Sequence, residues 1–234
     1  LTPSSNYTYT NLFWSSSFIE RGLGGNYFPL IIWNLTEEMS IGSVRFISLC
    51  ILMGNKILVV LLAEKISRNI ELNNIYKIIF FILLSVIFLS FISYNDTPHI
   101  GRRFFVFLLF LNTFYNSLGL SNKFSFNNYF LGFFSFIGIL WFLDIGIYIN
   151  ILIIIFLYFL FLRKELKSIF SILIGVITGW ILFYNLVSIE EFYAFIDNTY
   201  NIAKLIEQVG SIKYPLPFFE QNSRATKILI FFII

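Results

Sequence analysis

Residues 128–162 read NYFLGFFSFIGILWFLDIGIYINILIIIFLYFLFL, a predominantly apolar run whose one charged residue is Asp144. As a single helix this run would be about 52 Å long at 1.5 Å per residue, whereas the hydrocarbon core of a bilayer is about 30 Å thick. We therefore predict that the run breaks at Asp144-Ile145-Gly146 and forms a hairpin of two membrane-crossing helices.

The composition of the whole chain extends this interpretation. Hydrophobic residues make up 58% of the 234 residues, charged residues 12%, and the mean hydropathy is +0.81. Soluble domains are typically about 45–50% apolar and about 25% charged, so this chain lacks the residues for a water-facing exterior. Four more segments have about the length and apolarity of a bilayer crossing: Ser43–Ala63, Ile75–Tyr94, Phe104–Leu120 and Ile169–Val187. We predict an all-α, polytopic transmembrane helix bundle with six spans between residues 43 and 187.

The distribution of charge predicts how this bundle is oriented. Alternating spans place seven cations on one side: Lys65, Arg68, Lys77, Lys123, Arg163, Lys164 and Lys167. Cytoplasmic loops carry an excess of Lys and Arg, so we assign this side to the cytoplasm. Most of the acidic residues then lie on the outer face, which is compatible with chemistry done there. We expect a bacterial inner membrane and no nucleic-acid partner.

Two outer-face segments flank the spans in this topology. In residues 188–224, Ser188 and Glu191 form a capping-box pattern, and apolar residues recur at helical spacing until Gly210. This pattern predicts an amphipathic helix lying along the membrane surface. Residues 1–42 are expected to contain a similar interfacial helix around Trp14, ending where Gly22, Gly24 and Gly25 interrupt it. Residues 225–234 resemble the start of a truncated further span, so we interpret the chain as an internal part of a longer protein.

The loop from Asp96 to Arg103 carries the strongest local signal. Asp96 is a candidate helix cap, with Pro98 in the first turn. Arg102 and Arg103 follow in the early turns, where both the helix dipole and the positive-inside bias disfavour cations. A bound anion would offset both costs, because free amides at a helix start and Arg side chains together form a phosphate site. The alternative is that both arginines contact lipid headgroups at the interface.

Two further candidates in this region have structural alternatives. His99 is the only histidine of the chain, which argues against a zinc or multi-histidine site, although it has the chemistry of an acid or base beside Asp96. Asp144 is a suitable turn residue. A carboxylate at a shallow membrane re-entry is also partly desolvated, which suits it to act as a base or a metal ligand.

Lys56 lies near the middle of an apolar span, and an intramembrane ammonium is a candidate for function by default. It either pairs with Asp144 or faces a wet cleft as a structural residue. Glu37 and Glu38 precede the same span and are a minor candidate for binding a divalent cation.

Several segments together resemble a known family. They are Asn11–Gly22, Ser40–Arg45, Trp141–Tyr148, the Glu190-Glu191-Phe192 triplet and Tyr214–Pro217. Their order is similar to that of GT-C type polytopic membrane glycosyltransferases, the group that includes protein mannosyltransferases and lipopolysaccharide sugar transferases. The similarity extends over most of the chain without a single diagnostic motif.

The resemblance implies a polyprenyl-phosphate-linked sugar as donor, a catalytic acid on the outer face, and in some members a divalent cation. It makes Glu20, Asp96 and Asp144 the candidate catalytic residues, and His99, Arg102, Arg103 and Lys56 the candidate substrate-binding residues. The acidic pair that the family typically has after its first span is not evident here. No resident cofactor or metal site is otherwise expected.

Two other classes stay open at this stage. A transporter or flippase would use Lys56 and Asp144 as an intramembrane pair, although no internal repeat is recognisable. An accessory subunit of an organellar respiratory complex is suggested only by the abundance of Phe, Ile, Asn and Lys, which is typical of AT-rich genomes. The large amphipathic outer segments favour the transferase, because they are suited to hold an acyl chain at the surface.

Overall fold

The computed structural model describes residues 4, 10–12, 15, 22–71, 73–94, 98–118 and 124–209. Within these residues the chain is helical and contains no strand, as the sequence predicted. The elements are the π-helical turn η1 (Leu23–Tyr27) and the helices α2 (Phe28–Thr36), α3 (Ile41–Asn69), α4 (Asn74–Tyr94), α5 (Pro98–Leu118), α6 (Phe126–Trp141), α7 (Leu143–Leu162), α8 (Leu166–Leu186) and α9 (Ile189–Val209).

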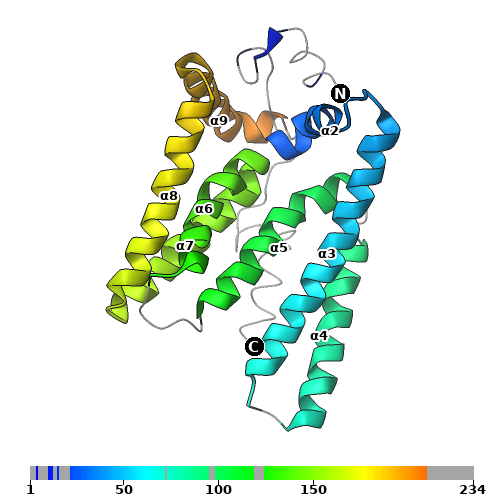
Figure 1. Ribbon diagram of the computed structural model, residues 1–234, viewed down its shortest axis with the longest axis vertical. Coiled ribbons are helices and arrows are strands. Elements are labelled where there is room, and N and C mark those ends of the chain that lie inside the picture. Colours follow the sequence, from blue (N-terminus) through cyan, green and yellow to red (C-terminus); the bar gives the residue numbers. More distant parts are fainter. Residues whose placement is uncertain are drawn as a thin grey trace.

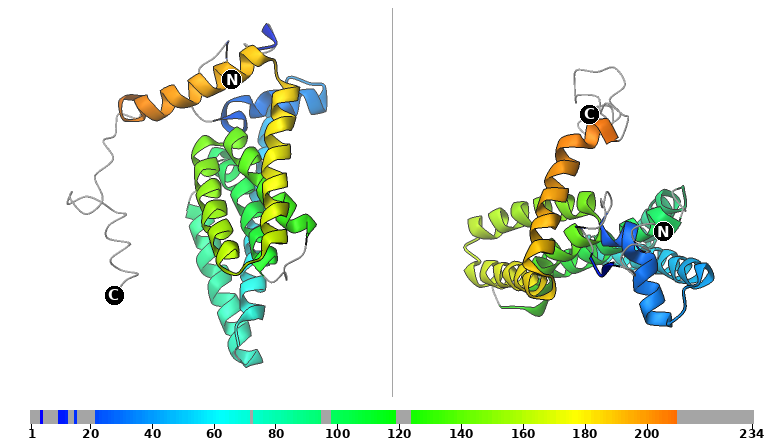
Figure 2. Two further views of the ribbon diagram at one scale, coloured as in Figure 1. Left: turned by 90° about the vertical axis from the view of Figure 1, so that its left-hand side faces the viewer. Right: turned by 90° about the horizontal axis from the view of Figure 1, so that it is seen from above.

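Helices α3 to α8 run along the long axis of the molecule, and α2 and α9 lie across one end of them (Figures 1 and 2). We call this the α2–α9 end; it also contains the start of α3, the start of α5 and the junction of α6 with α7. The opposite end contains the α3–α4 connection and the α7–α8 connection. Neither α2 nor the helical character of the glycine-rich η1 turn was predicted, because the glycines were expected to end a helix.

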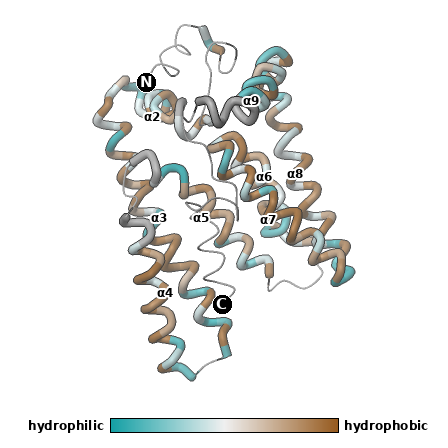
Figure 3. The backbone as a smooth tube through the Cα atoms, turned by 180° about the vertical axis from the view of Figure 1, so that it is seen from behind, coloured by the Kyte–Doolittle hydropathy of each residue, from teal (hydrophilic) through white to brown (hydrophobic). Residues whose placement is uncertain are grey.

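Three helices in the described part of the chain are long and apolar enough to cross a membrane: α3, α7 and the stretch Leu166–Asn185 of α8. At most 33% of the residues in the apolar stretch of each helix are buried, so most of this apolar surface faces outward. The hydropathy-coloured backbone shows apolar middles between more polar helix ends (Figure 3). This distribution is typical of helices surrounded by lipid and is unusual for a soluble bundle.

The described charges separate between the two ends. Arg68, Arg163, Lys164 and Lys167 lie at or next to the connections of the opposite end, together with Glu64, Glu71 and Glu165. Acidic residues predominate at the α2–α9 end: Glu37, Glu38, Asp144, Glu190, Glu191 and Asp197. The exceptions at that end are Arg45, Arg102, Arg103 and, on α9, Lys204.

The long apolar run does form a helical hairpin, but its break lies at Phe142, before the predicted turn. Phe142 alone adopts an extended conformation (φ −149°, ψ 121°) between α6 and α7. Its amide donates to the carbonyl oxygen of Gly138 over 3.0 Å, and its side chain is buried. Gly146 allows α6 and α7 to pack closely, because a Cβ there would lie 2.4 Å from the Cα of Ile139. The bend therefore needs one residue, and Asp144 and Gly146 belong to α7.

Helices α6 and α8 touch through their backbones. A Cβ on Gly132 would lie 1.9 Å from the carbonyl oxygen of Ile172, and one on Gly175 would lie 2.0 Å from that of Tyr129. Gly175 and Gly179 are four residues apart and form the small-xxx-small pattern that lets membrane helices approach closely. The packing of α6 against α8 thus requires glycine at these positions.

Polar side chains connect α3 to α5. The fully buried Asn55 donates from Nδ2 to the carbonyl oxygen of Gly101 over 2.6 Å. About three turns further along α5, Asn112 donates to the carbonyl oxygen of Leu58 over 3.0 Å and accepts a hydrogen bond from Nζ of Lys65 over 3.2 Å. These bonds fix the register of the two helices, because a shifted register would leave buried polar groups without partners.

We expect Gly175→Ala to lower the free energy of unfolding by about 1–3 kcal/mol, the usual cost of overpacking, because the new methyl group meets backbone that cannot move away. Thermal unfolding of the purified chain in detergent measures this loss.

Gly54→Ala is the matched control, since a Cβ there meets its nearest neighbour, the ring of Phe105, at an ordinary 3.5 Å. It should be neutral or stabilising, because Ala is the better helix former. A Gly175→Ala protein as stable as the wild type would contradict the backbone contact.

Candidate functional site

The candidate site lies at the α2–α9 end, where the start of α5 meets the junction of α6 and α7. The sequence predicted Arg102 and Arg103 in the early turns of a helix, and α5 begins at Pro98, so both stand in its second turn. Trp141, the last residue of α6, donates from Nε1 to the carbonyl oxygen of Arg102 over 2.9 Å. The hairpin junction is therefore hydrogen-bonded to the arginine segment.

Arg103 and Asp144 form an ion pair that joins α5 to α7. Asp144 stands in the first turn of α7, where the positive end of the helix dipole favours a carboxylate. The side chains are 43% and 40% exposed, so both are accessible from the surroundings. Two residues that the sequence named as separate candidates are thus brought together by the fold.

Arg102 faces the other way, toward α2. Its guanidinium lies over the ring of Phe28, 4.4 Å from the centroid, as in a cation–π contact. Phe28 in turn meets Trp141 edge to face at 6.2 Å. The glycine-rich turn packs on the same tryptophan, since a Cβ on Gly24 would lie 2.7 Å from its ring. Arg102 is therefore half-buried by aromatic side chains.

One donor of the site has no acceptor. The Nε atom of Arg103 is buried and makes no hydrogen bond among the described residues. A buried donor without a partner costs about 1–3 kcal/mol, so an acceptor oxygen bound there would be stabilised. This atom adds to the case for an anionic ligand at the start of α5.

Lys56 is half-buried on α3. The ion pair that the structure describes for Asp144 is made with Arg103, whereas the transporter hypothesis paired Asp144 with Lys56. Lys65 of α3 reaches into the α3–α5 interface, where its Nζ donates to Oδ1 of Asn112. Sequence reasoning missed this pair because Lys65 was read as part of a cytoplasmic charge cluster.

The other predicted site residues are placed only in part. Glu20 and Asp96 lie outside the described residues. His99 stands in the first turn of α5, close in sequence to the arginines, without a described side chain. Glu37 has the left-handed conformation (φ 57°) that ends α2, which gives it a structural role, and the cation hypothesis for Glu37 and Glu38 stays a prediction. The described residues contain no group of three or more His, Cys, Asp or Glu able to hold a metal ion.

One acidic residue has a contact that the sequence did not predict. Glu191 is 5% exposed, and its Oε1 accepts hydrogen bonds from the amide and the hydroxyl of Ser15. Its own amide donates to Oγ of Ser188 over 3.2 Å, which agrees with the predicted capping pattern. The local sequence gives no sign of this burial, because the contact is with a residue 176 positions away.

Comparison of the chain with models of protein families, with curated proteins and with solved structures finds no match. The resemblance to membrane glycosyltransferases accordingly stays a hypothesis, to be argued from the site itself.

The partial exposure of the Arg103–Asp144 ion pair predicts that the pair contributes little to stability. We expect a double-mutant cycle with Arg103→Gln and Asp144→Asn to give a coupling of about 0.2–1 kcal/mol in unfolding, because solvent and lipid headgroups screen a half-exposed pair. A coupling of about 3 kcal/mol or more, typical of desolvated pairs, would contradict this description.

Proposed function

We propose that the protein is a membrane-embedded glycosyltransferase that binds a polyprenyl-phosphate-linked sugar at the α2–α9 end. The observation that carries the proposal is the arrangement of Arg102, Arg103 and Asp144 where α5 and α7 begin, at one end of the apolar helices. A cationic pair beside an accessible carboxylate is what transfer of a sugar from a phosphate requires: charge stabilisation for the leaving group and a base for the acceptor.

In the proposed reaction the phosphate of the donor binds at the start of α5. Its oxygens accept hydrogen bonds from Arg102 and from Nε of Arg103, which has no partner among the residues that the structure describes. Bonds between guanidinium and phosphate are charge-assisted and are stronger than those between neutral groups. Phe28 and Trp141 hold Arg102 in place, so little side-chain entropy is lost when the anion binds.

Asp144 is the proposed base. Its carboxylate takes the proton of the acceptor hydroxyl while that oxygen bonds to the anomeric carbon of the sugar. The bond from this carbon to the phosphate oxygen breaks, and its electron pair leaves with the phosphate, whose added charge the arginines stabilise. Arg103 and the positive end of the α7 helix dipole hold the Asp144 carboxylate at the site. Glu20 and Asp96 stay alternative candidates for this role.

The position of the ion pair favours a transferase over a transporter. Substrate sites of secondary transporters lie near the middle of the bilayer. The Arg103–Asp144 pair lies instead at one end of the helices, where a lipid phosphate and a water-soluble acceptor can both reach it. The proposal also includes the six-span topology in a bacterial inner membrane, with the α2–α9 end outside.

Changing both Arg102 and Arg103 to Gln is expected to weaken binding of a polyprenyl phosphate at least about tenfold, because charge-assisted hydrogen bonds contribute about 1.5–3 kcal/mol each. Binding of the neutral polyprenol should change little. Binding measurements at microscale in detergent compare polyprenyl phosphate, polyprenol and, as a third ligand, phosphatidylglycerol.

Arg45→Gln is the control, because Arg45 is an exposed cation near the same end. Equal losses for phosphate and alcohol would remove the phosphate site. Equal affinity for phosphatidylglycerol and polyprenyl phosphate would reduce the site to a general contact with lipid headgroups.

The topology predicts labelling by a membrane-impermeant maleimide. In a Cys50→Ala background, Asp197→Cys on α9 should react in intact cells, and Glu165→Cys between α7 and α8 should react only after the membrane is opened. The reverse pattern would place the α2–α9 end in the cytoplasm and would overturn the proposed outer-face chemistry.

A further inference from the structure

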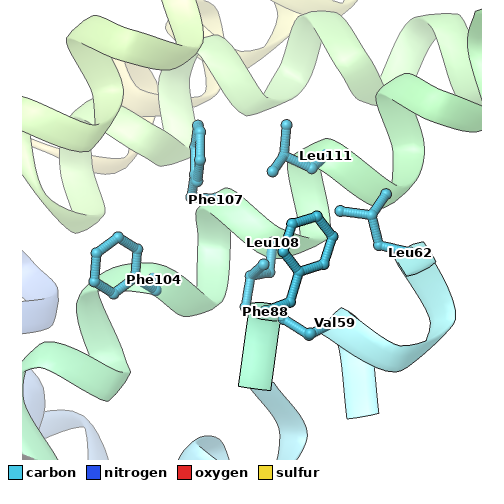
Figure 4. A pocket seen from close by; sticks show the side chains of 7 residues that line it. All are labelled: Val59, Leu62, Phe88, Phe104, Phe107, Leu108 and Leu111. Carbon is cyan, nitrogen blue, oxygen red and sulfur yellow. The ribbon is translucent and has the colours of Figure 1, made fainter. Parts of the chain in front are cut away.

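A cavity of about 160 Å³ lies between α3, α4 and α5 (Figure 4). Its walls include Val59 and Leu62 of α3, Phe88 of α4, and Phe104, Leu108 and Leu111 of α5. Every lining side chain is a hydrocarbon, and no polar surface is exposed to the space.

Water is a poor occupant of such a space. A buried water molecule needs about two to four polar partners, and apolar cavities of about this size stay dry and take up small apolar molecules. The nearby amide of Asn112 is already bonded to the carbonyl oxygens of Leu58 and Leu108. The available occupant is therefore a hydrocarbon.

The cavity also lies where α4 and α5 make few direct contacts with each other. Helix α4 packs mainly against α3, whereas α3 packs against both α4 and α5. The outward side of α4 is apolar and exposed, as at Ile79 (48%) and Val86 (56%). Hydrocarbon from the surrounding bilayer therefore reaches the edge of the cavity, and a chain inside it would connect α4 to α5.

We propose that the cavity takes up a segment of one acyl chain of a bilayer phospholipid. The site is separate from the proposed phosphate site: Arg103 contacts Asp144 on α7, whereas Leu108 and Leu111 line the side of α5 that faces α3 and α4. The proposal therefore holds whether or not the glycosyltransferase proposal does, and it predicts a bound lipid that stabilises the α3–α4–α5 unit.

The test measures lipid retention by native mass spectrometry of the full chain, extracted in mild detergent with palmitoyl-oleoyl phosphatidylglycerol. We expect the wild type to retain a phospholipid. Val59→Phe and Leu111→Phe fill the cavity and should reduce retention about tenfold. Val86→Phe adds the same bulk on the exposed side of α4 and should leave retention unchanged.

A second measurement uses the unaltered chain. A phosphatidylglycerol with a diazirine on its acyl chain is photolysed after excess lipid has been washed away, and the labelled residues are mapped. Labels are expected at Val59–Leu62 and Phe104–Leu111, in preference to the outward residues Ile79 and Ile82.

Three results would overturn the proposal. The first is that the wild type retains no phospholipid and that labels are spread over α4. The second is equal retention in the cavity-filling variants, and the third is selective retention of a polyprenyl phosphate. The last result would assign the cavity to the isoprenoid chain of the proposed donor instead. If the filled variants fail to fold, the labelling of the wild type decides alone.

Discussion

Backbone contact at glycine is the constraint on which the bundle depends. Between helices surrounded by hydrocarbon the hydrophobic effect provides little attraction, so close van der Waals packing must hold them together. Gly132 and Gly175 bring α6 against α8 so closely that a methyl group on either would overlap a carbonyl oxygen of the other helix. Helices α6 and α7 are also in backbone contact, because a Cβ on Gly146 would lie 2.4 Å from the Cα of Ile139 and one on Gly138 would lie 3.0 Å from the Cα of Gly146. Helix α6 is thereby fixed on two sides.

The position of α6 determines the geometry of the candidate site. Its last residue, Trp141, reaches the backbone of α5, and the single extended residue Phe142 reverses the chain so that Asp144 begins α7 beside Arg103. A longer turn would move the carboxylate away from the arginine. The charged site is thus a consequence of a tight apolar hairpin.

Polar groups inside the bundle fix the register of neighbouring helices. Asn55, Asn112 and Lys65 bond across the α3–α5 interface, and Asn150 bonds to the carbonyl oxygen of Ser135 across the hairpin. Each would be costly in hydrocarbon without its partner. The packing of the two halves of the molecule is consequently determined in different ways. Buried amides determine the α3–α5 interface, and glycines mainly determine the α6–α7–α8 unit.

The sequence alone determined the helical class, the approximate limits of the long helices and the grouping of charges at the two ends. These follow from local properties: apolar length, period and the spacing of charged clusters. It also singled out Arg102, Arg103 and Asp144 as unusual for their positions. It did not predict α2, because the glycines before Phe28 were interpreted as helix breakers and their packing against Trp141 is not visible in the local pattern.

Only the tertiary structure decided which of the unusual residues meet. Arg103 and Asp144 are 41 positions apart, and nothing in the local sequence distinguishes this pair from the Lys56–Asp144 pair considered first. The outcome depends on how helices α5 and α7 are rotated and how far they overlap along their axes. Those two quantities are fixed by glycine contacts and buried amides between distant segments, and periodicity along one segment does not encode them.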